Sequence, residues 1–345
     1  MSSTKYTYAV ARIRALETAL FDASVIEQLL ACSTEQQCIQ LLQEKGWGDA
    51  DTPAKAEAIL DREQEKAWET IRDLHVDMSV FDVFSYPNLF HNLKAAVKEA
   101  CTSQNGRNRK IYYEDTNISP DEMLDIIRSK EFSRLPEYMA SAAKEAYETL
   151  LHTGDGQLCD LIVDKAALEA VYHAGERATE NEAYYLARYD SLSQRIIQTD
   201  SIIRDYAESM VAIADIKIAV RSQKTAKTIE FMKRAMAPCK SLNVERLAKA
   251  ACSSMEAIVD YLAGTVYAEG AAAIAESSSA FERWCDNRMM RTMQPQKYES
   301  FSVGPLVAYL LARENEIKTV RIILSGKQNG FSEEAIRERV REMYV

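Results

Sequence analysis

An all-α fold is predicted by three features of this 345-residue sequence. Glycine and proline, the residues that mark turns, number only 11 and 7, so we expect few turns and long elements. Alanine, glutamate, leucine, arginine and lysine recur throughout while aromatic residues make up 8%, a composition that favours helices over strands. Between Gly175 and Pro238 there is neither glycine nor proline and apolar residues keep a helical spacing, which predicts two or three long helices.

The expected helices follow in order from apolar spacing and capping residues. An amphipathic helix begins near Tyr8, a second helix runs over 23–31, and a highly charged one covers 54–74. The tail 305–345 has the pattern of a helix pair, and only 110–113 alternates as a strand does. Residues whose side-chain oxygen can accept a first-turn N–H mark further helix starts: Ser33 or Thr34, Ser119, Ser241 or Asn243, and Ser332.

A short basic and aliphatic pattern recurs three times along the chain. NLKAAVK (92–98) aligns without gaps with DIKIAVR (215–221) and, more weakly, with TVRIILS (319–325). A capped helix start precedes each copy, so the order of the predicted helices recurs together with the amino-acid pattern. The basic residues in equivalent positions are Lys94, Lys217 and Arg321.

Further polar residues correspond around these copies. Asp215 stands where the first copy has an asparagine, and Asn88 and Asn315 match upstream of the first and third copies. A weaker match aligns Asp164 with Asp286. We treat these positions as candidates for structural contacts of the repeat or for an interface.

Three related helical subdomains are the domain organisation that this repeat predicts. Their boundaries are 1–110, 111–225 and 226–345, and each has the roughly 100–150 residues that one hydrophobic core needs. In each subdomain we expect the repeated basic side chain to pair with a carboxylate or to cap carbonyl groups at a helix end. The alternative is that it points toward a partner protein.

Charge and cysteine content restrict the classes of function. With 42 basic and 52 acidic residues the net charge is −10, which disfavours nucleic-acid binding unless a basic stripe is present. The short basic cluster of Arg107, Arg109 and Lys110 is followed at once by Glu114 and Asp115, so we interpret it as a solvated loop. Seven cysteines without a CxxC motif indicate reduced thiols in a cytosolic compartment.

No segment of the sequence has the pattern of a membrane anchor or an active site. The first residues carry charges and lack an apolar core, and the longest nearly apolar run, 303–312, is about half of what a spanning helix needs. The four histidines are scattered, and motifs for phosphate loops, dinucleotides and nucleophilic serines are absent. We expect neither catalysis nor a metal or cofactor, and no direct insertion into a membrane.

Two stretches of sequence resemble a known family. YLLARENEIKTVRIILSGK (309–327), within the closing run 304–345, and NLFHNLKAAVK (88–98) are the most specific parts, and the opening run 6–34 is also similar. Together they resemble the central-stalk C subunit of V/A-type rotary ATPases, the family that includes the eukaryotic d subunit. The similarity extends over essentially the whole chain.

The resemblance implies a fold, a function and a set of partners. The fold would be a funnel of three helical subdomains around a pseudo-threefold axis. The chain would be a non-catalytic socket on the cytoplasmic side of the membrane, joining shaft subunits of the D/F type to the membrane rotor ring. It would transmit the torque that couples ATP turnover to H⁺ or Na⁺ transport. The basic loop with Arg107, Arg109 and Lys110 would then be a candidate contact with the ring. The alternative is a free-standing helical scaffold that binds a partner helix in a concave face.

Overall fold

The computed structural model describes residues 6–102, 111–114, 116–189 and 202–345, and over 178–189 the helix backbone alone. These residues form α-helices α1–α16 and short 3₁₀-helices, and no strand occurs among them, so the predicted all-α class is confirmed. Residues 111–113 lie in a turn and not in a strand. Two compact units make up the chain: 1–78, 183–202 and 269–345 in unit 1, and 79–182 and 203–268 in unit 2. The division into three subdomains stays a prediction.

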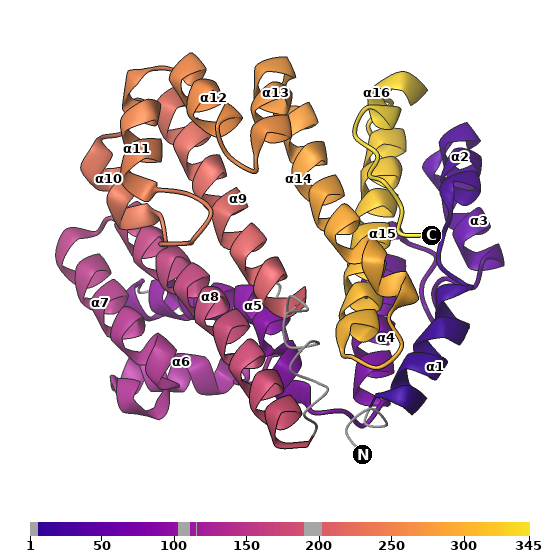
Figure 1. Cartoon of the computed structure of the whole chain (residues 1–345), viewed down its shortest axis with the longest axis horizontal. Helices are drawn as coiled ribbons and strands as arrows, with labels where there is room; N and C mark the ends of the chain where they lie inside the picture. The colour runs from indigo at the N-terminus through magenta and orange to yellow at the C-terminus, as the bar shows by residue number, and fades with distance from the viewer. Residues whose placement is uncertain (1–5, 103–110, 115, 190–201) are drawn as a thin grey trace. The chain divides into compact units, whose positions relative to one another are not determined.

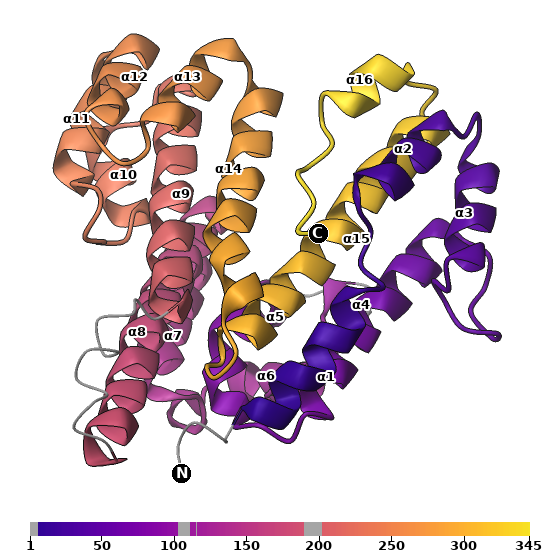
Figure 2. The ribbon, with the colours of Figure 1, turned by 45° about the vertical axis from the view of Figure 1, so that its right-hand side comes forward.

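Unit 1 is built around α15, a 25-residue helix from Gly304 to Gln328 (Figure 2). Eighteen of its residues are buried. Residues 304–313 are covered on every face, as an apolar stretch of helix must be, whereas the second half leaves Lys318, Arg321, Ser325 and Gln328 exposed along one face. The run 303–312 is therefore a core helix. Around it pack seven elements: α1 (Thr7–Glu17), α2 (Ala23–Ala31), α3 (Glu35–Glu44), α4 (Ala56–Arg72), α14 (Ser278–Met293), η6 (Gln294–Tyr298) and α16 (Glu333–Arg337). Unit 1 also includes nearly all of α13 (Ala268–Glu276) and the end of the long helix α8 (Gly156–Tyr189), from residue 183 on.

The core of unit 1 joins segments from the two ends of the chain. Buried aliphatic side chains of α15, such as Val320 and Ile323, pack with Leu29 of α2 and Leu42 of α3. Beside them the rings of Phe21 and Trp47 stack at 5.0 Å between centroids. Both aromatic residues lie in connecting segments, so the core fixes these connections as well as the helices.

Unit 2 combines long helices with several short ones (Figure 1). After η2 (Met78–Phe81) come α5 (Asp82–Cys101), α6 (Pro120–Ser129), η4 (Phe132–Arg134), α7 (Glu137–Thr153), α8 (Gly156–Tyr189), α9 (Ile202–Lys224), α10 (Ile229–Ala235), α11 (Val244–Ser253) and α12 (Met255–Ala263). The segment without glycine or proline thus contains the end of α8, α9 and α10, as predicted. Aromatic side chains contact one another between these helices. The ring centroids of Tyr86 and Tyr138 lie 5.0 Å apart, and those of Phe84 and Tyr206 lie 4.6 Å apart.

The capping predictions are confirmed, and the structure selects between the alternatives. Thr34 accepts from the Gln37 N–H at 3.2 Å to start α3, so Thr34 and not Ser33 is the cap. Likewise Asn243, and not Ser241, caps α11 through the Arg246 N–H at 2.9 Å. The Ser241 hydroxyl instead donates to Glu208 Oε1 at 2.6 Å. Ser119 and Ser332 cap their helices as expected.

Gly175 lies at a close approach between α8 and α9. A methyl group there would lie 2.5 Å from the Ala207 Cβ and 3.3 Å from the Arg204 Cα, and neither neighbour can rotate away. Gly156, at the first position of the same helix, has only the Lys98 Cε at 4.0 Å. The absence of a side chain at Gly175 therefore permits the contact of the two helices.

Gly175→Ala should destabilise unit 2 by about 1–3 kcal/mol, because overpacking outweighs the better helix propensity of alanine. Gly156→Ala should cost nothing measurable. Urea denaturation of both variants, followed by circular dichroism, checks the pair. Equal stability of the two variants would show that α8 and α9 are not in contact at this point.

Candidate functional site

A buried charge cluster lies at the centre of unit 1. The Arg313 guanidinium on α15 contacts the carboxylates of Glu63 on α4 and of Glu316 one turn further along α15. These residues are 8%, 3% and 1% exposed. Ionised side chains are this deeply buried only when they are paired, so the cluster holds α4 and α15 in one register.

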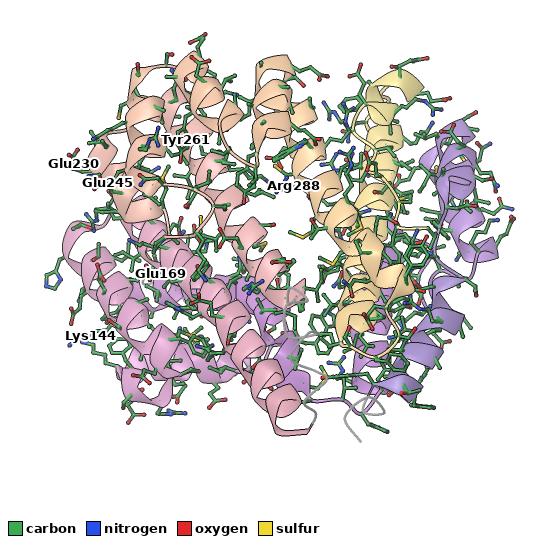
Figure 3. All side chains as sticks on the ribbon, in the orientation of Figure 1. Lys144, Glu169, Glu230, Glu245, Tyr261 and Arg288 are labelled. Carbon is green, nitrogen blue, oxygen red and sulfur yellow. The ribbon has the colours of Figure 1, made fainter. Side chains whose placement is uncertain are left out.

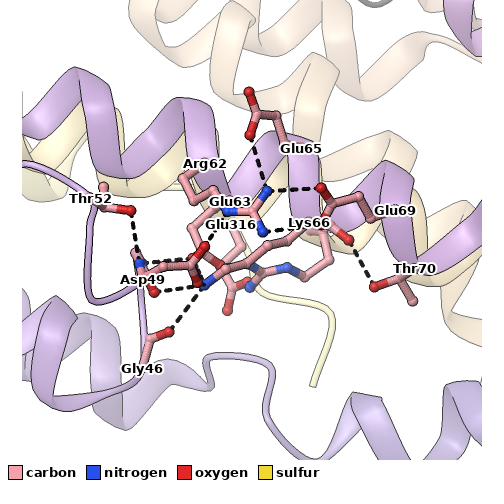
Figure 4. Close-up of polar contacts among 12 residues, drawn as sticks. Gly46, Asp49, Thr52, Arg62, Glu63, Glu65, Lys66, Glu69, Thr70 and Glu316 are labelled. Atoms are coloured by element: carbon pink, nitrogen blue, oxygen red, sulfur yellow. Dashed lines mark hydrogen bonds and ion pairs between the residues drawn. The ribbon is translucent and has the colours of Figure 1, made fainter.

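The same carboxylates also hold the connecting segments. Glu63 Oε1 accepts from the Gly48 N–H and from Lys66 Nζ, each at 2.8 Å (Figure 4). Glu316 accepts from the Phe21 N–H. Burial raises the pKa of Glu316, while the nearby Arg313 charge and the Phe21 N–H act to lower it. Both connections that carry the stacked aromatic rings are thereby fixed to the helices.

Outward from this cluster the ion pairs become exposed. Arg62 bonds Glu69 at 2.9 Å and Glu65 at 3.1 Å, and Lys66 reaches Asp49 at 3.1 Å (Figure 4). The Arg62 guanidinium, as the strongest cause, lowers the pKa of Asp49. Because water screens these charges, the outer pairs add little to stability and serve mainly to extend the network.

Unit 2 contains a polar clamp at the first copy of the repeat. Asn92 is fully buried on α5 and bonds both backbone groups of Tyr113. Its Oδ1 accepts from the Tyr113 N–H at 2.9 Å, and its Nδ2 donates to the Tyr113 carbonyl at 2.8 Å and to Thr116 Oγ1 at 3.1 Å. One amide thus holds the segment that follows α5 against that helix.

The second copy of the repeat has the same arrangement with a different residue. Asp215 on α9 is fully buried, and its Oδ1 accepts from the Ala237 N–H at 3.1 Å. Ala237 lies in the segment that returns after α10. Asn92 and Asp215 therefore perform equivalent tasks, although the sequence alignment marked only their equivalent positions.

In the third copy the clamp is shared between other side chains. Thr319 occupies the aligned position and is fully buried, but its Oγ1 has no hydrogen-bond partner among the described residues. Instead Asn315 Nδ2 donates to the Glu342 carbonyl at 2.9 Å, and Asn287 Oδ1 accepts from the Glu342 N–H at 2.9 Å. The function of Asn315 is thus that of Asn92, whereas Asn88, its sequence match, is half-buried on α5.

The repeated basic residues occupy three different environments. Lys94 Nζ bonds Asp164 Oδ1 at 2.6 Å, whereas Arg321 is exposed and reaches Glu57 only at 3.7 Å. Lys217 is half-buried on α9. In unit 1 the carboxylate that aligns with Asp164 is Asp286, and it is bonded by Lys318 at 2.8 Å and by Arg341 at 2.7 Å.

The predicted basic loop is the last of the candidate sites. Arg107, Arg109 and Lys110 lie outside the described residues. Its described neighbour Ile111 is 48% exposed, and the Ile111 carbonyl contacts His91 Nε2 at 2.9 Å.

Unit 2 also has a polar hollow of about 560 Å³. It is bordered by Lys240, which bonds Glu176 at 2.9 Å, and by Arg246, which stacks over the Tyr261 ring at 5.6 Å. Both of these cations therefore already have a partner within unit 2.

Charged side chains of both signs, Lys144, Glu169, Glu230 and Glu245 among them, project from unit 2 (Figure 3).

The described part of the chain contains neither a cluster of metal ligands nor a helix suited to span a membrane. No group of three histidine, cysteine or acidic residues there is arranged to hold a metal ion. None of the described helices combines the length and the apolar character that a membrane span requires.

The charge cluster is the feature that sequence reasoning missed. Glu63, Arg313 and Glu316 are ordinary charged residues in helices, and their spacing matches no motif. A signal was nevertheless present, because Arg313 and Glu316 interrupt the apolar face along which this helix is buried.

The fold and these contacts define an all-α structural protein in which buried polar groups join helices to connecting segments. Comparison with known proteins then identifies the family: a model of the ATP synthase (C/AC39) subunit matches residues 9–339, so the chain belongs to that family. Members are the non-catalytic C subunits of V/A-type ATPases, which confirms the resemblance found in the sequence.

Two relatives illustrate the match. The chain is 23% identical over 292 residues to the C subunit of the V-type sodium ATPase of Enterococcus hirae, covering 84% of this chain and 82% of the relative. It is 21% identical to the C subunit of the A-type ATP synthase of Methanocaldococcus jannaschii, covering 96% of this chain and 85% of the relative.

Arg313→Met should destabilise unit 1 by about 3–5 kcal/mol, because it leaves two buried carboxylates without their shared cation. The exposed pair of Arg337 with Glu27 provides the control, and Arg337→Met should leave the unfolding midpoint almost unchanged. Denaturant titrations of both variants measure the difference. If the two substitutions had the same effect, the buried cluster would not be holding the unit together.

Proposed function

We propose that this chain is the socket that joins the rotating central shaft of a V/A-type ATPase to its membrane rotor ring. In that position it transmits the torque that couples ATP turnover to the movement of H⁺ or Na⁺. Its partners would be shaft subunits of the D/F type on one side and the ring on the other. It would lie on the cytoplasmic side of the membrane, as a peripheral subunit. The three subdomains would surround a pseudo-threefold axis.

The family match over residues 9–339 is the observation that carries this proposal. Mechanical stiffness within each unit supports it. A part that transmits torque must not deform, and in this chain long helices are joined by buried ion pairs and by clamps such as Asn92 on Tyr113. Close-packed interiors of this kind transmit strain instead of absorbing it.

A contact between rotor parts also needs adequate area and charge. A joint that does not slip should bury more than the roughly 800 Å² per partner of an ordinary complex. On the ring side we propose a polar contact made by connecting segments, with the basic loop of Arg107, Arg109 and Lys110 as the candidate.

The assembled ATPase tests the proposed role directly. Complexes lacking this chain should still hydrolyse ATP in the soluble head, but ATP-driven ion uptake into vesicles should be lost, because nothing connects shaft and ring. Adding the purified chain back should restore uptake. Full ion transport without the chain, or its failure to co-purify with the ring, would instead favour a free-standing scaffold.

The basic loop can be tested by charge removal alone. Arg107→Gln, Arg109→Gln and Lys110→Gln together should weaken association with the ring at low ionic strength and reduce its dependence on salt. Asn105→Gln with Asn108→Gln alters the same loop without changing its charge and should have no effect. Ring pull-down across a salt series gives the measurement, and identical salt curves for both variants would place the ring contact elsewhere.

A further inference from the structure

Asn92 and Asp215 occupy equivalent positions in the repeat, but the amide nitrogen Nδ2 of Asn92 is replaced by the carboxyl oxygen Oδ2 in Asp215. Both are fully buried, and each is followed by a buried aliphatic residue and a lysine in the same pattern. The Oδ1 atom of each accepts a backbone N–H, that of Tyr113 at 2.9 Å and that of Ala237 at 3.1 Å. The first half of the two clamps is therefore the same.

The second half of the clamp distinguishes the two residues. Asn92 Nδ2 is a donor and bonds the Tyr113 carbonyl and Thr116. Asp215 Oδ2 is buried and has no partner among the described residues. An ionised carboxylate can only accept, so both its oxygens would need donors, and Oδ2 has none; a neutral carboxyl group carries no charge and is far less costly to bury with one oxygen unbonded. A buried and half-bonded charge is among the costliest arrangements in a protein.

The charges around Asp215 do not compensate for this burial. Lys165 on α8 is the cation that acts on it, but Lys165 Nζ also contacts the Lys233 carbonyl at 3.5 Å and Glu169 at 3.9 Å. The returning segment carries two titratable groups, the Cys239 thiol, which interacts with Asp215, and Lys240, which bonds Glu176. On α9 itself Lys217 is two residues away. Burial dominates and raises the pKa of Asp215 to about 8, while the Ala237 N–H and Lys165 lower it.

We propose that Asp215 is held as a neutral carboxylic acid in the place of an amide, so that unit 2 contains a pH-sensitive clamp between α9 and residues 236–243. Loss of the proton places an uncompensated charge between these elements and loosens the segment that leads into α11. The clamp at Asn92 and the one shared by Asn315 and Asn287 use amides and carry no such sensitivity.

The direction of the pH dependence follows from proton binding. The ordinary pKa of an aspartate is 3.8, and the folded value is about 8. Between these values the folded state holds one more proton than the unfolded state, so this group lowers stability as pH rises. The folding equilibrium constant should fall up to tenfold per pH unit within that window, and the contribution should level off above it.

Asp215→Asn in the full chain isolates the proposed proton. Urea midpoints would be measured from about pH 5 to about pH 9 for this variant, for the natural chain and for Asp51→Asn, which removes a charge at an exposed site. We expect Asp215→Asn alone to flatten the decline with pH and to be the more stable protein at the alkaline end. The converse variant, Asn92→Asp, should steepen the decline.

Three results would overturn the proposal. One is a pH profile of Asp215→Asn that parallels the natural chain, and another is failure of this variant to fold, since an amide should serve at that site. The third is an infrared spectrum near neutral pH in which Asp215→Asn removes no carbonyl band of a protonated carboxyl group.

Discussion

The pairing of Arg313 with Glu63 and Glu316 is the interaction on which unit 1 depends. Because Arg313 and Glu316 lie in the buried part of α15, their charges are removed from water and must be neutralised within the protein. The cluster does this by drawing α4 and two connecting segments onto the helix. The requirement to satisfy a buried cation thus determines where four parts of the chain meet, and the apolar core then fills the space around them.

In unit 2 the connecting segments are held to the helices by an amide and by a carboxyl group that we propose to be neutral. Its connecting segments return over α5 and α9, and a single buried side chain on each helix, Asn92 or Asp215, bonds the passing backbone. A backbone group in a buried segment needs such a partner, since water cannot reach it. Clamps of this kind fasten the connections to the helices, which suits a protein proposed to carry torque.

The repeat shows how far similar sequence leads to similar contacts. The three aligned positions Asn92, Asp215 and Thr319 share full burial, yet only Asn92 and Asp215 bond a returning segment, and Thr319 Oγ1 has no partner among the described residues. In the third copy Asn315 and Asn287, and not the aligned residue, bond the backbone of the returning segment. The aligned position is therefore buried in all three copies, while the bonding side chain differs. Burial is set by the helix packing and is more persistent than the identity of the bonding group.

The sequence by itself determined the all-α class, the helix starts at Thr34, Ser119, Asn243 and Ser332 within one or two residues, and the family. These depend on composition, on apolar spacing and on caps only three residues long, all of which are local. Only the tertiary structure decided that Arg313 meets Glu63, 250 residues away, and that Asn92 and Asp215 clamp backbone while Arg321 stays at the surface. Such contacts arise from the packing of distant helices, and a charged or amide side chain looks the same in a sequence whether water or a buried partner satisfies it.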